Sequence, residues 1–125
     1  MSEAKFTVFV ADDDAGQLDL ATDLLQSVGH GVLAEQDATR VFARIVEEQP
    51  DLVLLDVMMP KKSGFEVCQA LRADAATAQI KVVMLTAKGR ESEVAKGMAL
   101  GADLYVTKPF STKDLVARVK SMLGA

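Results

Sequence analysis

The segment LVLLD, residues 52–56, is a run of four apolar residues that ends in an aspartate. The segment VVML, residues 82–85, is a second unbroken apolar run. Runs of this length are typical of central strands in a parallel sheet, because helices cover such strands on both faces. The two segments therefore predict the middle of an α/β sheet.

Short β-type runs and stretches of helical period alternate along the whole chain. Between the runs, apolar residues recur at spacings of three and four, as expected of helices with one buried face. Strict alternation of strand and helix predicts a parallel sheet with right-handed crossovers. The predicted strands are residues 6–11, 31–35, 52–56, 80–85 and 104–106, and the helical stripes run from Leu18 to Val28, Ala38 to Val46, Phe65 to Leu71, Val94 to Met98 and Leu115 to Leu123.

Residues typical of helix ends flank these stripes. Asp14 stands directly before the first helical stretch, where a carboxylate can accept a backbone N–H and stabilise the helix by about 1 kcal/mol. Ser111 and Asp114 form a capping-box pattern at the start of the last helix. Gly29 and Gly101 follow helix ends, as the preference for glycine at that position predicts.

Length and composition limit the classes of protein to which the chain can belong. With 125 residues, 50% of them hydrophobic, the chain is long enough for one compact domain, which we expect to span residues 1–125. The net charge of −4 and the lack of a basic stripe argue against direct binding of nucleic acid. No apolar run reaches the roughly 18 residues of a membrane helix, so no contact with a membrane is expected.

Cysteine and histidine are too scarce for several kinds of site. Cys68 is the single cysteine and His30 the single histidine. Disulfide scaffolds and Cys/His zinc sites are therefore excluded. A reducing cytoplasm is the expected location.

Three adjacent aspartates, Asp12, Asp13 and Asp14, follow the first predicted strand. Two carboxylates about 4 Å apart repel by roughly 4 kcal/mol at an effective dielectric near 20, a large share of a small domain's stability. Helix capping accounts for Asp14 but not for all three. A bound cation would compensate the repulsion, and without one we expect at least one of these carboxyls to have a raised pKa.

Polar residues also follow other predicted strands. Asp56 ends the third strand, Thr86 follows the fourth and Lys108 follows the fifth, whereas the second strand ends at Glu35 and Gln36 and adds no such group. In an open parallel sheet the ligand site lies beyond the carboxyl ends of the strands, so we expect these side chains to meet the aspartates there. Such a cluster suits a hard cation with a phosphoryl group beside it, and Mg²⁺ fits best.

Four motifs, in this order, resemble the receiver domain of two-component response regulators. They are VADDD (10–14), LVLLDVMMP (52–60) with Gly64 downstream, MLTA (84–87) and GADLYVTKPF (101–110). The resemblance covers essentially the whole chain. It implies a doubly wound, flavodoxin-like α/β fold with five parallel strands in the order 2-1-3-4-5.

The resemblance implies a metal and phosphoryl site. Asp12 and Asp13 match the acidic pair that binds Mg²⁺ in this family. Asp56 matches the phosphoacceptor, which also contacts the metal, and the backbone carbonyl of Met58 matches a further metal ligand. Mg²⁺ is therefore the expected cofactor.

Three more residues match family positions that respond to the phosphoryl group. Thr86 matches the hydroxyl that senses it, Lys108 the amine that pairs with it, and Tyr105 the aromatic whose rotamer follows the threonine. The bond between Lys108 and Pro109 matches one that is cis in the family, as an X–Pro bond can be.

The family's function implies a phosphorelay. A histidine kinase or a histidine phosphotransfer protein would donate a phosphoryl group to Asp56, and the face made by the fourth helix, fifth strand and fifth helix would then change for a downstream effector protein or a fused output domain. The chain would be a signalling switch, not an enzyme with a separate substrate, because it would catalyse only its own phosphorylation and dephosphorylation.

The sequence leaves the assembly open. The segment from Gly101 onward resembles receivers of DNA-binding regulators, in which Asp103 and Arg118 would pair across a phosphorylation-dependent homodimer. Leu104 stands where many of those receivers carry a second acid. The chain is either a stand-alone receiver or part of a longer regulator.

Three other interpretations compete. In a haloacid-dehalogenase-like phosphatase, Asp12 would be the nucleophile and Asp14 the acid, but Thr86 and Ala87 stand where that family has acids. A flavodoxin needs a hydroxyl- and glycine-rich phosphate loop where the aspartates lie. The third is a receiver-like interaction module that works without phosphorylation.

Overall fold

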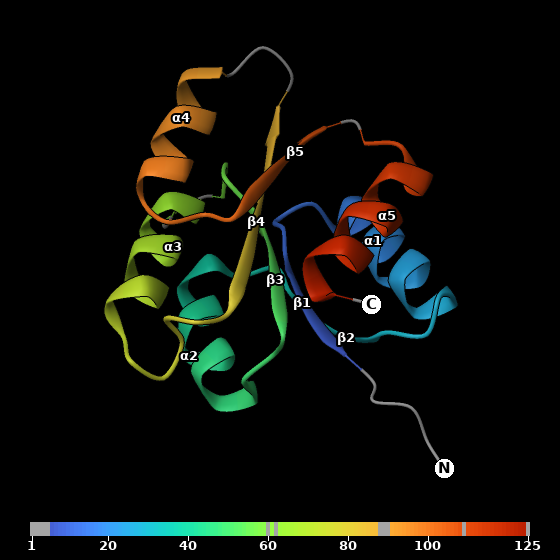
Figure 1. Ribbon diagram of the computed structural model, residues 1–125, viewed down its shortest axis with the longest axis horizontal. Coiled ribbons are helices and arrows are strands. Elements are labelled where there is room, and N and C mark those ends of the chain that lie inside the picture. The colour runs from blue at the N-terminus through green and yellow to red at the C-terminus, as the bar shows by residue number, and fades with distance from the viewer. Residues whose placement is uncertain (1–5, 60, 62, 88–90, 109, 125) are drawn as a thin grey trace.

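Five strands and five helices alternate along the computed structural model, which describes residues 6–59, 61, 63–87, 91–108 and 110–124 (Figure 1). The elements are β1 (Thr7–Ala11), α1 (Ala15–Ser27), β2 (Gly31–Glu35), α2 (Ala38–Glu48), β3 (Leu52–Asp56), α3 (Gly64–Ala73), β4 (Lys81–Ala87), α4 (Glu91–Ala99), β5 (Leu104–Lys108) and α5 (Thr112–Leu123).

The strands form one parallel sheet in the order β2-β1-β3-β4-β5. This order confirms the predicted doubly wound α/β fold. Helices α1 and α5 cover one face of the sheet, and α2, α3 and α4 cover the other (Figure 1).

Alternate residues of each strand face the two helical layers, as the pleat of a strand requires. In β1, Val8 and Val10 pack into the core beneath α1 and α5, while Phe9 and Ala11 pack into the core beneath α2 and α3. Every residue of β3 is buried, which confirms that LVLLD is a central strand. Asp56, the last residue of β3, therefore lies buried at the carboxyl edge of the sheet.

Two strands extend farther than predicted. β4 ends at Ala87 rather than at residue 85, and β5 ends at Lys108 rather than at residue 106. The extra residues are polar or small, so the apolar pattern does not reveal them. Parallel pairing of Thr86 with Thr107 continues the ladder and brings Thr86 and Lys108 to the edge that holds Asp56.

Helix caps hold the loops at this edge. The Asp14 side chain accepts a hydrogen bond from Gln17 N at 3.0 Å, which confirms its predicted capping of α1. A capping box joins Ser63 and Glu66 at the start of α3, the helix that follows the Asp56 loop. The sequence pattern S-x-x-E is typical of a capping box, although the box at Ser63 was not among the predictions.

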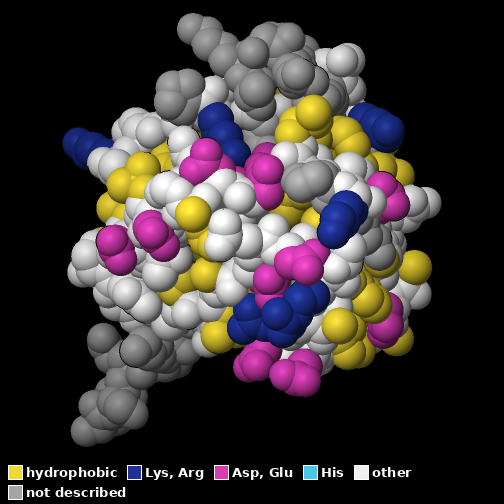
Figure 2. Space-filling model, turned by 180° about the vertical axis from the view of Figure 1, so that it is seen from behind, with side chains coloured by type: hydrophobic (Ala, Val, Ile, Leu, Met, Phe, Trp, Pro, Cys, Tyr) yellow, Lys and Arg dark blue, Asp and Glu magenta, His cyan; other side chains and the backbone are white. Residues whose placement is uncertain are grey.

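The single cysteine, Cys68, lies fully buried in the core. None of the helices in the described part of the chain has the length and apolar character needed to cross a membrane. On the face drawn in Figure 2, Lys and Arg side chains are scattered among Asp and Glu side chains.

Candidate functional site

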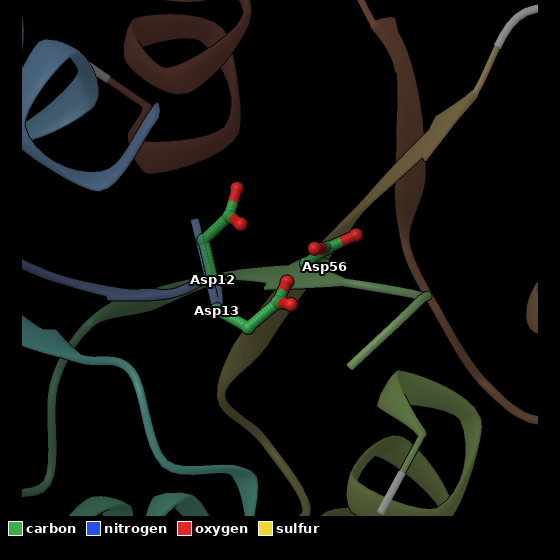
Figure 3. A group of neighbouring side chains, drawn as sticks. All are labelled: Asp12, Asp13 and Asp56. Carbon is green, nitrogen blue, oxygen red and sulfur yellow. The ribbon is translucent and has the colours of Figure 1, made fainter. Parts of the chain in front are cut away.

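The carboxylates of Asp12, Asp13 and Asp56 converge at the carboxyl edge of the sheet. Each offers one oxygen, and these oxygens all lie within 4.8 Å of one another. Figure 3 shows the three side chains beside the ends of β1 and β3. Asp12 and Asp56 are only 2% and 5% exposed, whereas Asp13 is open to solvent. The site is therefore a half-buried acidic cluster with one accessible side.

Lys108 supplies the cation of the cluster. Its Nζ donates to Asp12 Oδ2 at 2.9 Å and lies 3.3 Å from Asp56 Oδ2. Burial alone would lower the pKa of the Lys108 ammonium, but its hydrogen bond to Asp12 and the charge of Asp56 outweigh that effect and raise the pKa. The amine therefore stays charged between the two buried carboxylates.

Asp56 has the most perturbed acid–base behaviour of the site. Burial raises the pKa of its carboxyl, the charge of Asp12 raises it further, and Lys108 only partly opposes them, so the pKa reaches about 7. The sequence predicted a raised pKa within the run of three aspartates at 12–14, whereas the raised pKa belongs to Asp56, which lies against Asp12. A cation bound here would favour the ionised form of Asp56.

Thr86 and Tyr105 differ in exposure. Thr86 is 2% exposed, and its hydroxyl is buried without a hydrogen-bond partner among the described residues. A buried polar atom without a partner costs about 1–3 kcal/mol, so this hydroxyl is suited to a group that arrives from outside the chain. Tyr105 is 40% exposed and belongs to β5, an edge strand of the sheet.

The loop after β3 holds Asp56 through its backbone. Met58 N donates to Asp56 Oδ1 at 3.1 Å, and the Met58 side chain is 54% exposed. Gly64 N donates to Val57 O at 3.0 Å. A Cβ at Gly64 would overlap Asp56 O and lie 3.0 Å from Val57 Cα, so only glycine lets α3 begin this close to the phosphoacceptor candidate.

The end of β2 contributes more than the sequence predicts. Gln36 Nε2 donates to Asp13 O at 3.3 Å, and Asp12 N donates to Glu35 O at 3.2 Å. These bonds tie the acidic loop to the edge strand, a role that the sequence did not predict, while the acidic cluster itself contains no residue of β2. The Gln36 side chain bonds to a backbone atom, and no spacing in the sequence indicates such a contact.

Asp103 and Arg118, expected to pair across a dimer, both have partners within the chain. Asp103 Oδ2 lies 2.7 Å from Arg72 Nη2, and Asp114 Oδ2 lies 3.0 Å from Arg118 Nε. A contact between chains through Asp103 and Arg118 would have to share or replace these pairs. Pro109, of the predicted cis bond, lies outside the described residues.

The donor set tests whether Mg²⁺ suits this cluster. All three converging side chains offer hard carboxylate oxygens, and neither cysteine nor histidine belongs to the group. Mg²⁺ prefers a few carboxylates and keeps several waters, whereas zinc prefers sulfur and nitrogen. The residues therefore fit Mg²⁺, with the open side at Asp13 available to water and substrate.

Residues 8–120 match the family model of the response regulator receiver domain. The phosphate regulon transcriptional regulatory protein PhoB of Pseudomonas aeruginosa is 41% identical over 117 residues, which are 94% of this chain and 51% of that protein. The DNA-binding response regulator MtrA of Mycobacterium tuberculosis is 41% identical over 123 residues, which are 98% of this chain and 53% of that protein. The chain thus spans about half the length of the curated relatives it matches.

Solved structures share the fold over nearly the whole chain. A protein of Chloroflexus aurantiacus described as a response regulator is similar with a TM-score of 0.93 at 30% identity, over 98% of this chain and 100% of that one. The chemotaxis protein CheY4 of Vibrio cholerae is similar with a TM-score of 0.89 at 26% identity, over 95% of this chain and 99% of that one.

Proposed function

The chain belongs to the response regulator receiver domain family, and from this premise we propose that it accepts a phosphoryl group on Asp56 within a two-component phosphorelay. One observation carries the proposal. A carboxylate that is 5% exposed ends the central strand, 3.3 Å from a lysine ammonium and within 4.8 Å of two further aspartates. A carboxylate buried in this way is rare unless it has a chemical task.

Asp56 would act as the nucleophile. One of its carboxylate oxygens forms a bond to phosphorus, and the bond from phosphorus to the imidazole nitrogen of a phosphohistidine breaks. The electron pair returns to the ring nitrogen, which takes up a proton. Lys108 would hold the oxygens of the transferring group, because its charged Nζ already lies beside Asp56 Oδ2.

Asp12, Asp13, Asp56 and the backbone carbonyl of Met58 would hold Mg²⁺. The bound ion would supply positive charge to phosphoryl oxygens, which is the main form of catalysis in phosphoryl transfer. Gln36 would support this site by fixing the backbone of Asp13.

The partnerless hydroxyl of Thr86 suggests how the modification is sensed. A phosphoryl group on Asp56 would offer the acceptor that Thr86 Oγ1 lacks among the described residues. Movement of Thr86 toward it would open space beside β5, into which the exposed ring of Tyr105 could turn. The face formed by α4, β5 and α5 would change with it, so a local charge would bias a two-state surface.

The partners follow from the chemistry and from the relatives. A histidine kinase or a histidine phosphotransfer protein would donate the phosphoryl group, and an effector protein or a fused output domain would read the changed face. The relatives PhoB and MtrA are named as a transcriptional regulator and a DNA-binding regulator, which favours an output of that kind. A phosphorylation-dependent homodimer remains part of the proposal, although Asp103 and Arg118 are engaged within the chain.

Mass spectrometry of the intact protein tests the proposal. The chain is incubated with a small acyl phosphate, with Mg²⁺ in one sample and a chelator in the other. We expect one added phosphoryl group with Mg²⁺ and none with the chelator. No gain in either sample would favour the second function, an interaction module that works without phosphorylation, and a partner would then bind wild type and Asp56→Asn equally.

A further inference from the structure

The side chain of Arg72, near the end of α3, joins two loops that are distant in the sequence. Its guanidinium donates to Ala78 O at 3.0 Å and Ile80 O at 2.7 Å, before β4, and to Gly101 O at 2.8 Å, between α4 and β5. The planar, branched shape of a guanidinium allows several such bonds at once. Arg72 thus fixes both loops to α3, which passes close to the connection from α4 to β5 (Figure 1).

Asp103 completes this arrangement. Its Oδ2 accepts from Arg72 Nη2 at 2.7 Å and from Val82 N at 2.8 Å, while its own amide donates to Val82 O at 2.9 Å. Gly101 has φ +105°, and a Cβ there would lie 2.8 Å from Arg72 Cγ. The left-handed backbone and the packing of Arg72 against Gly101 both hold the connection in one conformation.

Helix α4 itself is held less firmly than its C-terminal end. Among the described side-chain positions of α4, residues 92 and 94–99, only Gly97 is buried. A Cβ added at Gly97 would make ordinary contacts, 3.4 Å from the Phe65 ring and 3.6 Å from Met84 Cγ. The buried position of the helix is thus filled by a residue that has no side chain. Lys96 lies over the Phe65 ring at 4.8 Å. Little apolar side-chain area therefore anchors the helix body.

We propose that Arg72 and Asp103 form an internal clip that fixes the connection between α4 and β5, so that α4 changes position by pivoting about this end. This inference rests on the proposed function in one respect, since phosphorylation of Asp56 is the event that would move α4. The clip also gives Asp103 a role within the chain, where the family resemblance suggested a contact between two chains.

Amide hydrogen exchange of the unphosphorylated protein tests the clip. In Arg72→Ala, we expect the amides of residues 100–103 to exchange faster by about tenfold or more, as the loss of a charge-assisted hydrogen bond implies, with α1 unchanged. Arg118→Ala is the matched control, because it removes an arginine from an exposed ion pair with Asp114 and should leave residues 100–103 unaffected.

Arg72→Lys is a milder variant that keeps the test valid if Arg72→Ala fails to fold. Lysine keeps the charge but lacks the branched donors, so exchange at residues 100–103 should still rise, by less than in Arg72→Ala. Unchanged exchange at residues 100–103 in both Arg72 variants would overturn the clip.

The pivot is tested in the wild-type protein, with phosphorylation verified by intact mass. Phosphorylation should alter exchange in residues 91–96 and leave residues 100–103 as they were, whereas in Arg72→Ala the change should extend through residues 100–103. Equal changes along residues 91–103 of the wild type would overturn the pivot. Absence of phosphoryl uptake would count against the proposed function and against phosphorylation as the cause of the movement of α4. Amide exchange in the unphosphorylated variants would still test whether the clip exists.

Discussion

The Nζ atom of Lys108 lies 3.3 Å from Oδ2 of Asp56, although 51 residues, 57–107, lie between them in the sequence. The same Nζ lies 2.9 Å from Asp12 Oδ2. The amine therefore partly neutralises two buried carboxylates that would otherwise repel each other. Replacing it tests whether this charge serves phosphoryl transfer.

Lys108→Met should slow phosphorylation by an acyl phosphate by on the order of 10²-fold, because a positioned charge on the transferring group is lost. The pKa of Asp56 should rise further, since the charge of Lys108 is the larger of the two effects that lower it, the other being the hydrogen bond from Met58 N. Initial rates followed by intact mass check the first expectation. Lys113→Met, at an exposed position of α5, is the control, and equal rates in both variants would exclude a role for Lys108.

The raised pKa of Asp56 predicts a pH-dependent stability in metal-free protein. The folded carboxyl titrates at about 7 and the ordinary carboxyl at 3.8, so between these pH values the folded state holds a proton that the unfolded state releases. This contribution to the free energy of unfolding is present below pH 4 and is lost as the pH rises through 7.

Asp56→Asn lacks this titration. Its free energy of unfolding, relative to wild type, should increase between pH 4 and pH 7 by an amount on the order of a few kcal/mol. Urea unfolding in the presence of a chelator measures the difference. A difference between the two proteins that stays constant across this range would show that Asp56 titrates normally.

Gly64→Ala should displace the backbone of Asp56. The added Cβ would overlap Asp56 O, so the loop or α3 must move, at a cost of roughly 1–3 kcal/mol in stability. Phosphorylation should slow as well, because the nucleophile shifts. Gly97→Ala is the matched control: its Cβ would make ordinary contacts of 3.4–3.8 Å, and alanine favours the helix by about 1 kcal/mol. Equal stability of the two variants would contradict the close approach at Gly64.

Lys61→Gly should stabilise the protein. Lys61 has φ 72°, in the left-handed region, which is unfavourable for residues with a Cβ and accessible to glycine. Relief of this strain should raise the free energy of unfolding by about 1 kcal/mol. Lys61→Ala removes the same charge but keeps the strain, so its stability should stay near that of wild type. The same gain in both variants would assign the effect to charge.

Much of the fold could be predicted from the sequence because its strongest signals are local. β2 and β3 match the predicted residues 31–35 and 52–56, since their apolar runs end sharply at charged residues. β4 and β5 were predicted too short. Thr86 and Lys108 belong to strands because β4 and β5 pair with each other at these positions, and a pattern of hydrophobic residues does not predict that pairing.

The residues of the candidate site were predicted from the sequence, but several of the contacts that hold them were not. Asp12, Asp13, Asp56 and Lys108 were expected at one edge because each follows a strand, and the structure brings them together. The contact from Gln36 to Asp13 O was not predicted. Neither was the group of bonds that Arg72 makes to three backbone carbonyls, because contacts to backbone atoms leave no mark in residue type or spacing.

The central claim is that Asp56 is the residue that accepts the phosphoryl group. The most direct test is the intact mass of wild type, Asp56→Asn and Asp19→Asn after incubation with a small acyl phosphate and Mg²⁺. Asp19 is an exposed aspartate on α1 and serves as the matched control. We expect one added phosphoryl group on wild type and on Asp19→Asn and none on Asp56→Asn. A phosphoryl group retained by Asp56→Asn would contradict the assignment.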